Sequence, residues 1–206
     1  MMKTKRCGDL AWLAVVLPLL IGFCAAAQSP SPSGNPAQET EFKPYVMDHD
    51  YFSCEIPVAW DLQRDAEEDV EYGIYEIYLN APAPMTSINV RYLLKDNGDF
   101  AGYKDFLERN SKNVLGETQN AREHYGPVQA TKLGGTKAFE LRRERMVYLH
   151  PESKSDESAS LKEMLYVVPM KDGSFYVLHY TAEAAVFEEY LPVFERVAAS
   201  FKPRGR

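Results

Sequence analysis

Residues 161–180 read LKEMLYVVPMKDGSFYVLHY, and this segment limits the architectures that the chain can adopt. Two apolar runs flank a Lys-Asp-Gly turn at 171–173, and Asp-Gly between such runs is a strong signal for a β-hairpin. Residues 164–168 and 175–178 are apolar at every position, so the usual alternation of apolar and polar residues is lost. This loss predicts that both faces of the hairpin are covered.

Two amphipathic helices are expected to provide that cover. The first begins at Asp99, a suitable N-cap, and ends near Gly116. Its apolar positions are Phe100, Tyr103, Phe106, Leu107 and Val114. The second runs from about Glu183 to Ser200, where Pro192 either kinks it or starts its main segment. Its apolar stripe consists of Phe187, Tyr190, Leu191, Phe194, Val197, Ala198 and Phe201.

The other apolar segments are short and read as strands. The expected strands are 51–56, 72–79, 86–93, 128–133, 136–149, 161–170 and 174–180. Gly134-Gly135 predicts a second tight hairpin, and the acidic segment 65–71 is expected to be a loop. Short connections imply antiparallel pairing. The predicted fold class is therefore α+β, an antiparallel sheet with a helix on each face, or α/β/α sandwich.

The first 27 residues are typical of an export signal. Three positive charges come first, an apolar run follows, and Ala25-Ala26-Ala27 offers small residues for cleavage after Ala27. Two alternatives stay open. The segment could remain uncleaved as a membrane anchor. Cys24 could instead be lipidated, although Phe23 stands where that processing favours a small residue. The expected location is periplasmic or secreted, with membrane attachment only through the N-terminus.

Residues 28–44 contain much Pro, Ser and Gly at their start and predict a flexible linker. Residues 45–203 then form the domain. A domain of about 160 residues buries roughly 70% of its unfolded surface, which is enough for a stable core without covalent cross-links.

Charge and cysteine content limit the partners and cofactors. The formal net charge is −7, and removal of residues 1–27, which contribute +2, leaves −9. An acidic surface disfavours nucleic acid as a partner. Cys7 and Cys24 lie in the signal, which leaves Cys54 alone. Neither a disulfide framework nor a CxxC pair for zinc or redox chemistry is expected, and no cofactor is predicted.

Two acidic segments are candidates for cation binding. Asp48, His49 and Asp50 place two carboxylates beside an imidazole, but consecutive side chains in an extended segment point in alternating directions. A solvated turn is the favoured interpretation, and a metal site is the alternative. The acidic segment 65–71 lacks the ligand spacing and the glycine of an EF-hand loop, so an exposed polar loop is favoured there too.

Several residues in strands are also candidates. His179 shares a face with Phe175 and Val177, which favours a hydrogen-bonded interior histidine over a ligand or proton role. Segment 142–145 (RRER) is expected to protect a sheet edge, and Arg143 and Arg145 are the alternative candidates for anion binding.

Cys54 is expected to be a small buried hydrophobe rather than a reactive thiol. Tyr72, Tyr75 and Tyr78 are expected on one strand, as core or sheet-face residues, although tyrosine also suits interfaces. No catalytic motif is present in the sequence: neither GxSxG nor HExxH, no phosphate-binding glycine loop and no dinucleotide fingerprint. The chain is therefore expected not to be an enzyme.

Three landmarks resemble the PsbP-like proteins. FSCEIP at 52–57 followed by Trp60 resembles their opening strand and Pro-x-x-Trp corner, although Ala59 stands where the family usually has glycine. GSFYVLHY at 173–180 resembles their penultimate segment, and 194–201 looks like their closing helix. The resemblance covers residues 45–203 in order and element type. The family includes an extrinsic subunit of photosystem II and bacterial envelope proteins, but no photosystem contact residues map onto this chain.

What the resemblance implies is an accessory or assembly module without catalysis. Together with the signal and linker, it predicts an exported protein that docks on a protein complex of the cell envelope. The alternative is a periplasmic module that binds a small ligand or divalent cation between a helix and the sheet. Fold alone does not decide between them.

Overall fold

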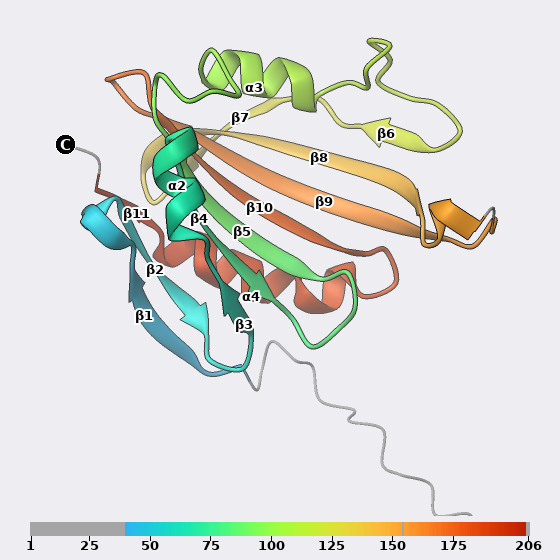
Figure 1. Cartoon of the computed structure of the whole chain (residues 1–206), viewed down its shortest axis with the longest axis horizontal. Helices are drawn as coiled ribbons and strands as arrows, with labels where there is room; N and C mark the ends of the chain where they lie inside the picture. The colour runs from blue at the N-terminus through green and yellow to red at the C-terminus, as the bar shows by residue number, and fades with distance from the viewer. Residues whose placement is uncertain (1–39, 154, 205–206) are drawn as a thin grey trace, which may run out of the picture. The chain divides into compact units, whose positions relative to one another are not determined.

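The computed structural model describes residues 40–153 and 155–204, with the side chain of Glu68 left out. Within these ranges the chain forms two antiparallel sheets and three α-helices (Figure 1). The large sheet has the order β3 (Asp61–Gln63), β4 (Ile74–Asn80), β5 (Ser87–Leu93), β10 (Phe175–Glu183), β9 (Ser158–Pro169), β8 (Thr136–Tyr148) and β6 (Glu123–Tyr125), and β7 (Gln129–Leu133) also pairs with β8. The small sheet has the order β1 (Phe42–Val46), β2 (Phe52–Pro57) and β11 (Lys202–Pro203). The helices are α2 (Ala66–Tyr72), α3 (Tyr103–Asn110) and α4 (Phe187–Ser200). Short 3₁₀ turns occupy Asp48–Asp50 and Pro151–Ser153.

The β9–β10 hairpin lies in the middle of the large sheet, as predicted. Phe175 pairs with Pro169 and Glu183 with Leu161 in continuous antiparallel register. Gly173 in the turn has φ +94°, a conformation that favours glycine. Asp172 completes the turn, because its Oδ1 accepts hydrogen bonds from the backbone N–H and the hydroxyl of Ser174.

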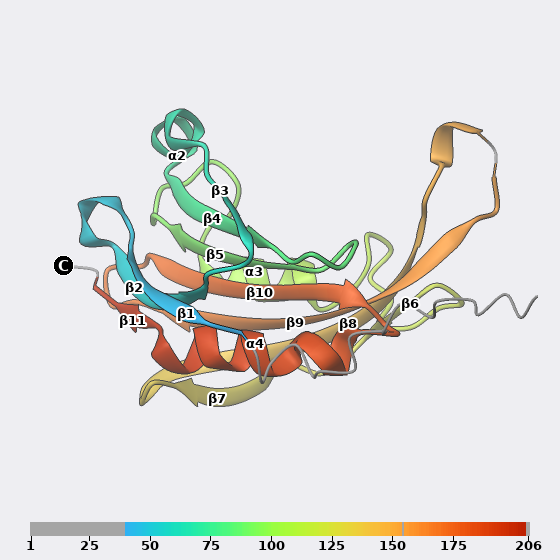
Figure 2. The ribbon, with the colours of Figure 1, turned by 90° about the horizontal axis from the view of Figure 1, so that it is seen from below.

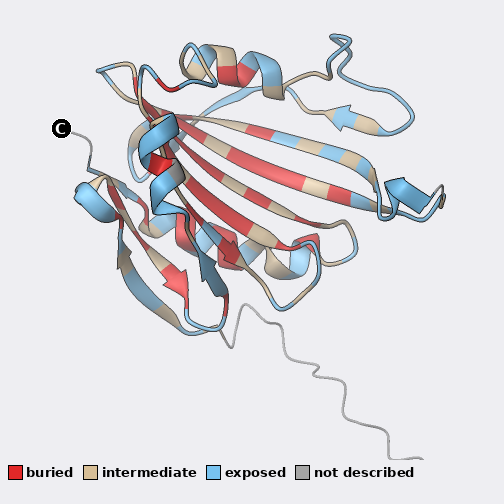
Figure 3. Ribbon diagram, in the orientation of Figure 1, coloured by how far each residue is buried: buried red, intermediate tan, exposed pale blue. Residues whose placement is uncertain are grey.

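Helices cover both faces of this hairpin, which confirms the predicted architecture (Figure 2). On one face, Met164, Val168, Tyr176 and Leu178 belong to the core that includes buried residues of α4. On the other face, Leu165, Val167, Phe175 and Val177 pack in a second core with Phe106 and Leu107 of α3. Figure 3 shows the resulting band of buried residues along the central strands. Burial on both sides explains why the apolar–polar alternation is absent.

The small sheet was not anticipated. The predicted strand 51–56 corresponds to β2, but β2 pairs with β1 and β11 rather than with the large sheet. It joins the α4-side core through Phe52, whose ring centroid lies 6.0 Å from that of Phe201. The hydroxyl of Tyr176 donates to the carbonyl of Tyr51 at 2.7 Å, which ties the large sheet to the start of β2. Residues 42–44, expected in the linker, are the first residues of β1.

Two segments differ from the sequence prediction because side chains hydrogen-bond to the backbone. Helix α3 begins at Tyr103 rather than near Asp99, since Oδ1 of Asn97 accepts the N–H groups of Asp99 and Phe100 and holds a turn there. It ends at Asn110, so Val114 is not on its apolar face. Asn and Asp favour such local bonds over helix continuation.

The expected acidic loop 65–71 contains helix α2 instead. Asp69 is 2% exposed, and its carboxylate accepts hydrogen bonds from Nε of Arg64 and from the N–H of Glu76. These bonds fix the helix against the β4 edge of the sheet, an effect that composition alone does not reveal. Tyr72 consequently ends α2 and does not lie on a strand with Tyr75 and Tyr78.

No helix within the described residues is long and apolar enough to span a membrane. The expected signal (1–27) lies outside the described residues, as do Cys24 and most of the expected linker.

Candidate functional site

Polar side chains gather on the α3 face of the large sheet around Glu163 of β9. The carboxylate of Glu163 has no exposed surface. It accepts hydrogen bonds from Nε of Arg143, on the neighbouring strand β8, and from Nε of Arg145 at 2.8 Å. Nε2 of His179, on β10, lies 3.6 Å from its Oε2. The three residues proposed from sequence as ligand-binding candidates are thus brought together by one buried glutamate that sequence reasoning missed.

The charged side chains in this cluster are paired with one another. Burial alone would raise the pKa of Glu163, but the hydrogen bond and charge of His179 and the guanidinium of Arg143 outweigh it and lower that pKa. Burial lowers the pKa of His179, an effect that Glu163 only partly opposes. His179 also has a hydrogen bond between its Nε2 and Oγ1 of Thr181, at 3.1 Å.

The cluster also anchors α3 to the sheet. Nη1 of Arg143 donates to Oδ1 of Asn110, the last residue of α3, at 3.1 Å. The expectation that segment 142–145 protects a sheet edge is wrong, because β8 lies between β9 and the strands β6 and β7. Arg143 and Arg145 of this segment bind Glu163 on β9, whereas Arg142 is exposed and binds Glu140. This arrangement favours a structural ion cluster over an open anion site.

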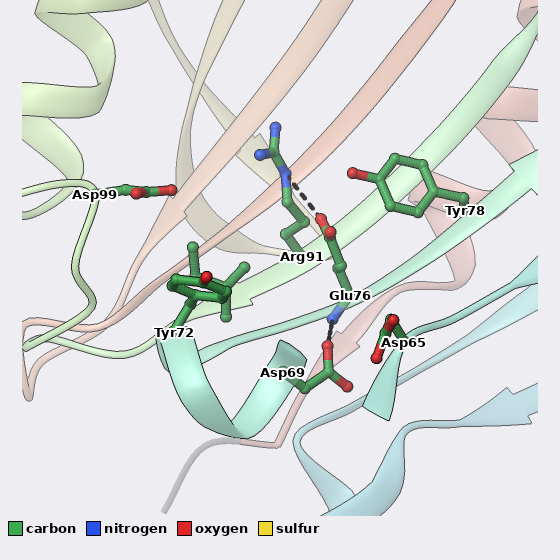
Figure 4. A pocket seen from close by; sticks show the side chains of 8 residues that line it. Asp65, Asp69, Tyr72, Glu76, Tyr78, Arg91 and Asp99 are labelled. Atoms are coloured by element: carbon green, nitrogen blue, oxygen red, sulfur yellow. Dashed lines mark hydrogen bonds and ion pairs between the residues drawn. The ribbon is translucent and has the colours of Figure 1, made fainter. Parts of the chain in front are cut away.

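Beside this cluster is a cleft of about 360 Å³ over strands β4 and β5 (Figure 4). Its lining consists of Asp65, Asp69, Tyr72, Ile74, Glu76, Tyr78, Arg91 and Asp99. The acidic segment that sequence analysis assigned to a loop therefore forms one wall, and the β4–β5 pair forms the floor. Arg91 is the one basic side chain in this lining, and no sequence motif drew attention to it.

Arg91 lacks the partners that a buried arginine usually has. Its Nε is buried and has no hydrogen-bond partner, and the nearest carboxylate oxygen, Oε2 of Glu76, is 3.8 Å away. Burial lowers the pKa of Arg91, although Glu76 acts in the opposite direction. Asn89, 5% exposed, donates from Nδ2 to the same Glu76 oxygen at 3.3 Å and to the carbonyl of Ile77 at 3.1 Å. Glu76 is therefore held in place, and the guanidinium of Arg91 also lies over the ring of Phe106, with its Cζ 6.0 Å from the ring centroid.

The metal candidates Asp48, His49 and Asp50 do not converge. The carboxylate of Asp48 binds Arg64 at 2.6 Å, whereas that of Asp50 binds Arg204 at 2.5 Å. The ring of His49 packs against two tyrosine rings. Within the described part of the chain, no three His, Cys, Asp or Glu side chains are placed to hold one metal ion.

Cys54 is a free, buried thiol at 4% exposure on β2. Burial, with a smaller contribution from Glu55, raises its pKa to about 12. A thiol with so high a pKa is a poor nucleophile at neutral pH, so the expected role as a buried hydrophobe fits its position.

A second feature that the sequence analysis missed is the loop after α3. Val114 is fully exposed and Leu115 is 78% exposed. Their side chains border a groove of about 640 Å³ that is also lined by Arg109, Lys112, Asn113, Asn120, Glu123 and Tyr125. The available signal was the pair of apolar residues inside an otherwise polar stretch, but helical spacing assigned Val114 to α3.

No family model and no curated protein matches the sequence, but its fold resembles solved structures. Cyanobacterial PsbP from Synechocystis sp. PCC 6803 is similar at TM-score 0.52 and 12% identity, over 86% of this chain and 98% of that chain. The chain has a PsbP-like fold.

Two further solved structures resemble this PsbP-like chain at lower TM-scores. PA94 from Pseudomonas aeruginosa, a protein of unknown function and putative regulator, gives TM-score 0.45 and 16% identity over 81% of this chain and 99% of that chain. LpqN of Mycobacterium tuberculosis, involved in cell envelope biogenesis, gives TM-score 0.42 and 16% identity over 80% and 91%.

The landmarks that suggested the PsbP-like fold occupy structural positions. Segment 52–57 is β2, and Trp60 packs edge-on against Tyr190 of α4 with ring centroids 5.9 Å apart. Ala59 lies in an exposed turn without a positive φ, so this corner does not require the glycine that is usual in the family. The landmarks therefore identify the fold and do not identify a functional site.

Proposed function

We propose that this chain is an exported accessory module, without catalytic activity, that docks on a protein complex of the cell envelope. The export signal and linker predicted from sequence support the location. The PsbP-like fold supports an accessory role through the family resemblance. The observation that carries the docking role is the Val114–Leu115 loop, defined as residues 111–117.

The loop presents its apolar pair in a fixed conformation. Oδ1 of Asn113 accepts the N–H groups of Leu115 and Glu117, both at 2.9 Å. The backbone N–H of Asn113 donates to the carbonyl of Glu117, and that of Gly116 donates to the carbonyl of Asn113, both also at 2.9 Å. Gly116 has φ +82°, which the turn requires. A loop held by its own hydrogen bonds loses little conformational entropy when a partner binds.

The surroundings fit the surface of a protein partner. The groove next to Leu115 contains the aromatic ring of Tyr125 and the basic side chains of Arg109 and Lys112. Arg109 is held by Asp105 at 2.7 Å and Lys112 by Glu108 at 3.0 Å. Apolar residues at the centre with polar, charged residues around them are the usual composition of an interface. The side chains of Val114 and Leu115 are largely exposed within the described residues. Burial against a partner is therefore the role proposed for them.

Cross-linking in intact envelopes followed by pull-down of the tagged chain tests this function. The wild type is compared with the Val114→Ser/Leu115→Ser double variant and with Val70→Ser, which removes an apolar side chain that is 69% exposed on α2. We expect one reproducible partner with the wild type and with Val70→Ser, and its loss with the double variant. Recovery of the wild type as a monomer without a partner would refute the docking role, and equal recovery with the double variant would refute the assignment of this loop.

A further inference from the structure

The guanidinium of Arg91 is the feature of the cleft that the proposed docking role does not explain. Figure 4 shows it extending past Glu76 into the space between Asp99 and Tyr78. Its Nε has no hydrogen-bond partner although it is buried, and the side chain as a whole is only 22% exposed. Burying an arginine Nε without a hydrogen bond is costly, and arginine presents a planar fork that matches a carboxylate.

The rest of the lining selects among anionic ligands. Four carboxylates, those of Asp65, Asp69, Glu76 and Asp99, surround the single arginine. A simple anion such as sulfate would approach Arg91 against these negative charges. A polyamine would suit the carboxylates but would place another positive charge beside Arg91. A ligand that carries a carboxylate for Arg91 together with ammonium groups for the surrounding carboxylates reduces each of these penalties.

The carboxylates of the cleft differ in the hydrogen bonds and ion pairs that they already form. Asp69 is engaged by Arg64 and by the N–H of Glu76, and Glu76 is shared by Asn89 and Arg91. Asp99 is exposed, and its hydrogen bonds are made by its backbone: its N–H donates to Oδ1 of Asn97, and its carbonyl accepts from Arg109. Among these three, its carboxylate is the one that no hydrogen bond or ion pair holds within the described ranges, so it can meet a cation that enters the cleft.

Aromatic side chains line the cleft on both sides of Arg91, Tyr72 on the side of Asp99 and Tyr78 on the other (Figure 4). Tyr72 is 48% exposed and Tyr78 is 41% exposed, and both rings line the cleft together with Ile74. Rings in this position pack against an aliphatic stem and also favour a nearby ammonium group. A volume of about 360 Å³ lies within the range of small-molecule sites.

We propose that this cleft binds a basic amino acid, with the α-carboxylate on Arg91, the α-ammonium beside Glu76, the side-chain ammonium on Asp99 and the aliphatic stem against Tyr72. The site is separate from the Val114–Leu115 loop, so this inference does not depend on docking. The proposed role is binding alone, in which no bond of the ligand is made or broken.

Isothermal titration of the purified protein with three matched compounds tests the site. L-lysine carries both charges, cadaverine lacks the carboxylate, and L-norleucine lacks the side-chain ammonium. We expect L-lysine to bind, and cadaverine to bind at least about tenfold more weakly because it leaves Arg91 without a carboxylate. L-norleucine should also bind more weakly, by a smaller factor, because the Asp99 that it leaves unpaired is exposed. The wild type alone decides this comparison: absence of L-lysine binding at about 10 mM, where a site with a Kd of about 1 mM would be mostly occupied, or equal binding of cadaverine, would overturn the proposal.

Three variants assign the contacts. Arg91→Gln should reduce the affinity for L-lysine to that for cadaverine, and Asp99→Asn should weaken L-lysine while leaving norleucine unchanged. Arg142→Gln, which removes an exposed arginine bound to Glu140, is the matched control and should bind like the wild type. Asp99 is exposed, so its variant is expected to fold even if Arg91→Gln does not. Undiminished L-lysine binding by Asp99→Asn, or by folded Arg91→Gln, would also overturn the proposal.

Discussion

Nε2 of His179 on β10 lies 3.6 Å from Oε2 of Glu163 on β9, inside the large sheet. The same glutamate accepts hydrogen bonds from Arg143 and Arg145 on β8. Three adjacent strands are therefore joined by side chains as well as by backbone hydrogen bonds. Arg143 extends the connection to Asn110 at the end of α3.

Replacing Glu163 should strongly destabilise the fold. Glu163→Gln removes the negative charge, but the side chain of Arg143, which is only 16% exposed, keeps its positive charge. Breaking a buried ion pair on one side costs about 3 kcal/mol or more. We expect a loss of about that size in the free energy of unfolding, measured by urea denaturation. Arg142→Gln on the same strand should change it by less than about 1 kcal/mol, since Arg142 forms an exposed pair. Equal effects would refute the structural role of the cluster.

The contribution of Glu163 should disappear in acid. Its pKa in the folded protein is lowered to about 2, below the ordinary value of 4.5. A lowered carboxyl pKa stabilises the fold above the unfolded value, and this stabilisation is lost as the pH falls through the folded value. The difference in unfolding free energy between wild type and Glu163→Gln should therefore shrink as the pH falls below 4.5 and be smaller at pH 3 than at pH 5. Urea titrations at pH 7, 5, 4 and 3 measure it, and a difference that does not change with pH would contradict this linkage.

Truncation on either face of the central hairpin should be equally damaging. Phe106 of α3 is 1% exposed and Phe194 of α4 is fully buried. Each Phe→Ala substitution should cost about 3 to 5 kcal/mol, because it removes buried area and leaves a cavity. Val114→Ser, on the fully exposed side chain, should change stability by less than about 0.5 kcal/mol. A negligible effect of Phe106→Ala would mean that α3 does not cover its face.

At the β7–β8 turn, backbone strain can be measured separately from side-chain packing. Gly135 has φ +84°, and a Cβ placed there would have no atom within 4 Å. Gly135→Ala should therefore cost about 1 kcal/mol from the left-handed backbone alone. Gly135→Asn should cost less, since asparagine tolerates this conformation better. Thermal unfolding of the two variants measures the difference, and the reverse order would exclude this explanation.

The layers of the fold were predictable because they depend on patterns within short segments. Residues 164–168 and 175–178 are apolar throughout, and only cover on both faces makes such a hairpin favourable. Gly134-Gly135 and Asp172-Gly173 identified the two hairpins through their turn chemistry.

Sequence patterns could not predict the features that depend on hydrogen bonds from a single side chain to the backbone a few residues away. The carboxylate of Asp69 binds the N–H of Glu76 and turns an acidic segment into a helix. Asn113 closes the loop that exposes Val114, a residue whose spacing alone fits a helix. The small sheet depends on β1 and β11, which are short and carry no clear alternation.

The candidate site was predictable only in part. His179, Arg143 and Arg145 were identified from their unusual places in apolar strands, but their common partner Glu163 was not. Register decides this, since Glu163 pairs with Arg143 on one side and with Thr181 on the other. Arg91 reads in sequence as an ordinary strand residue, and its cleft exists only because α2 and Asp99 are placed over β4 and β5.

Docking through the Val114–Leu115 loop is tested most directly by a photo-crosslinking side chain placed at position 115 and, separately, at position 70. Both positions are exposed, on the loop and on α2 respectively. Irradiation of intact envelopes should give one reproducible covalent adduct from position 115 and none from position 70. No adduct from position 115, or the same adduct from both positions, would contradict docking through this loop.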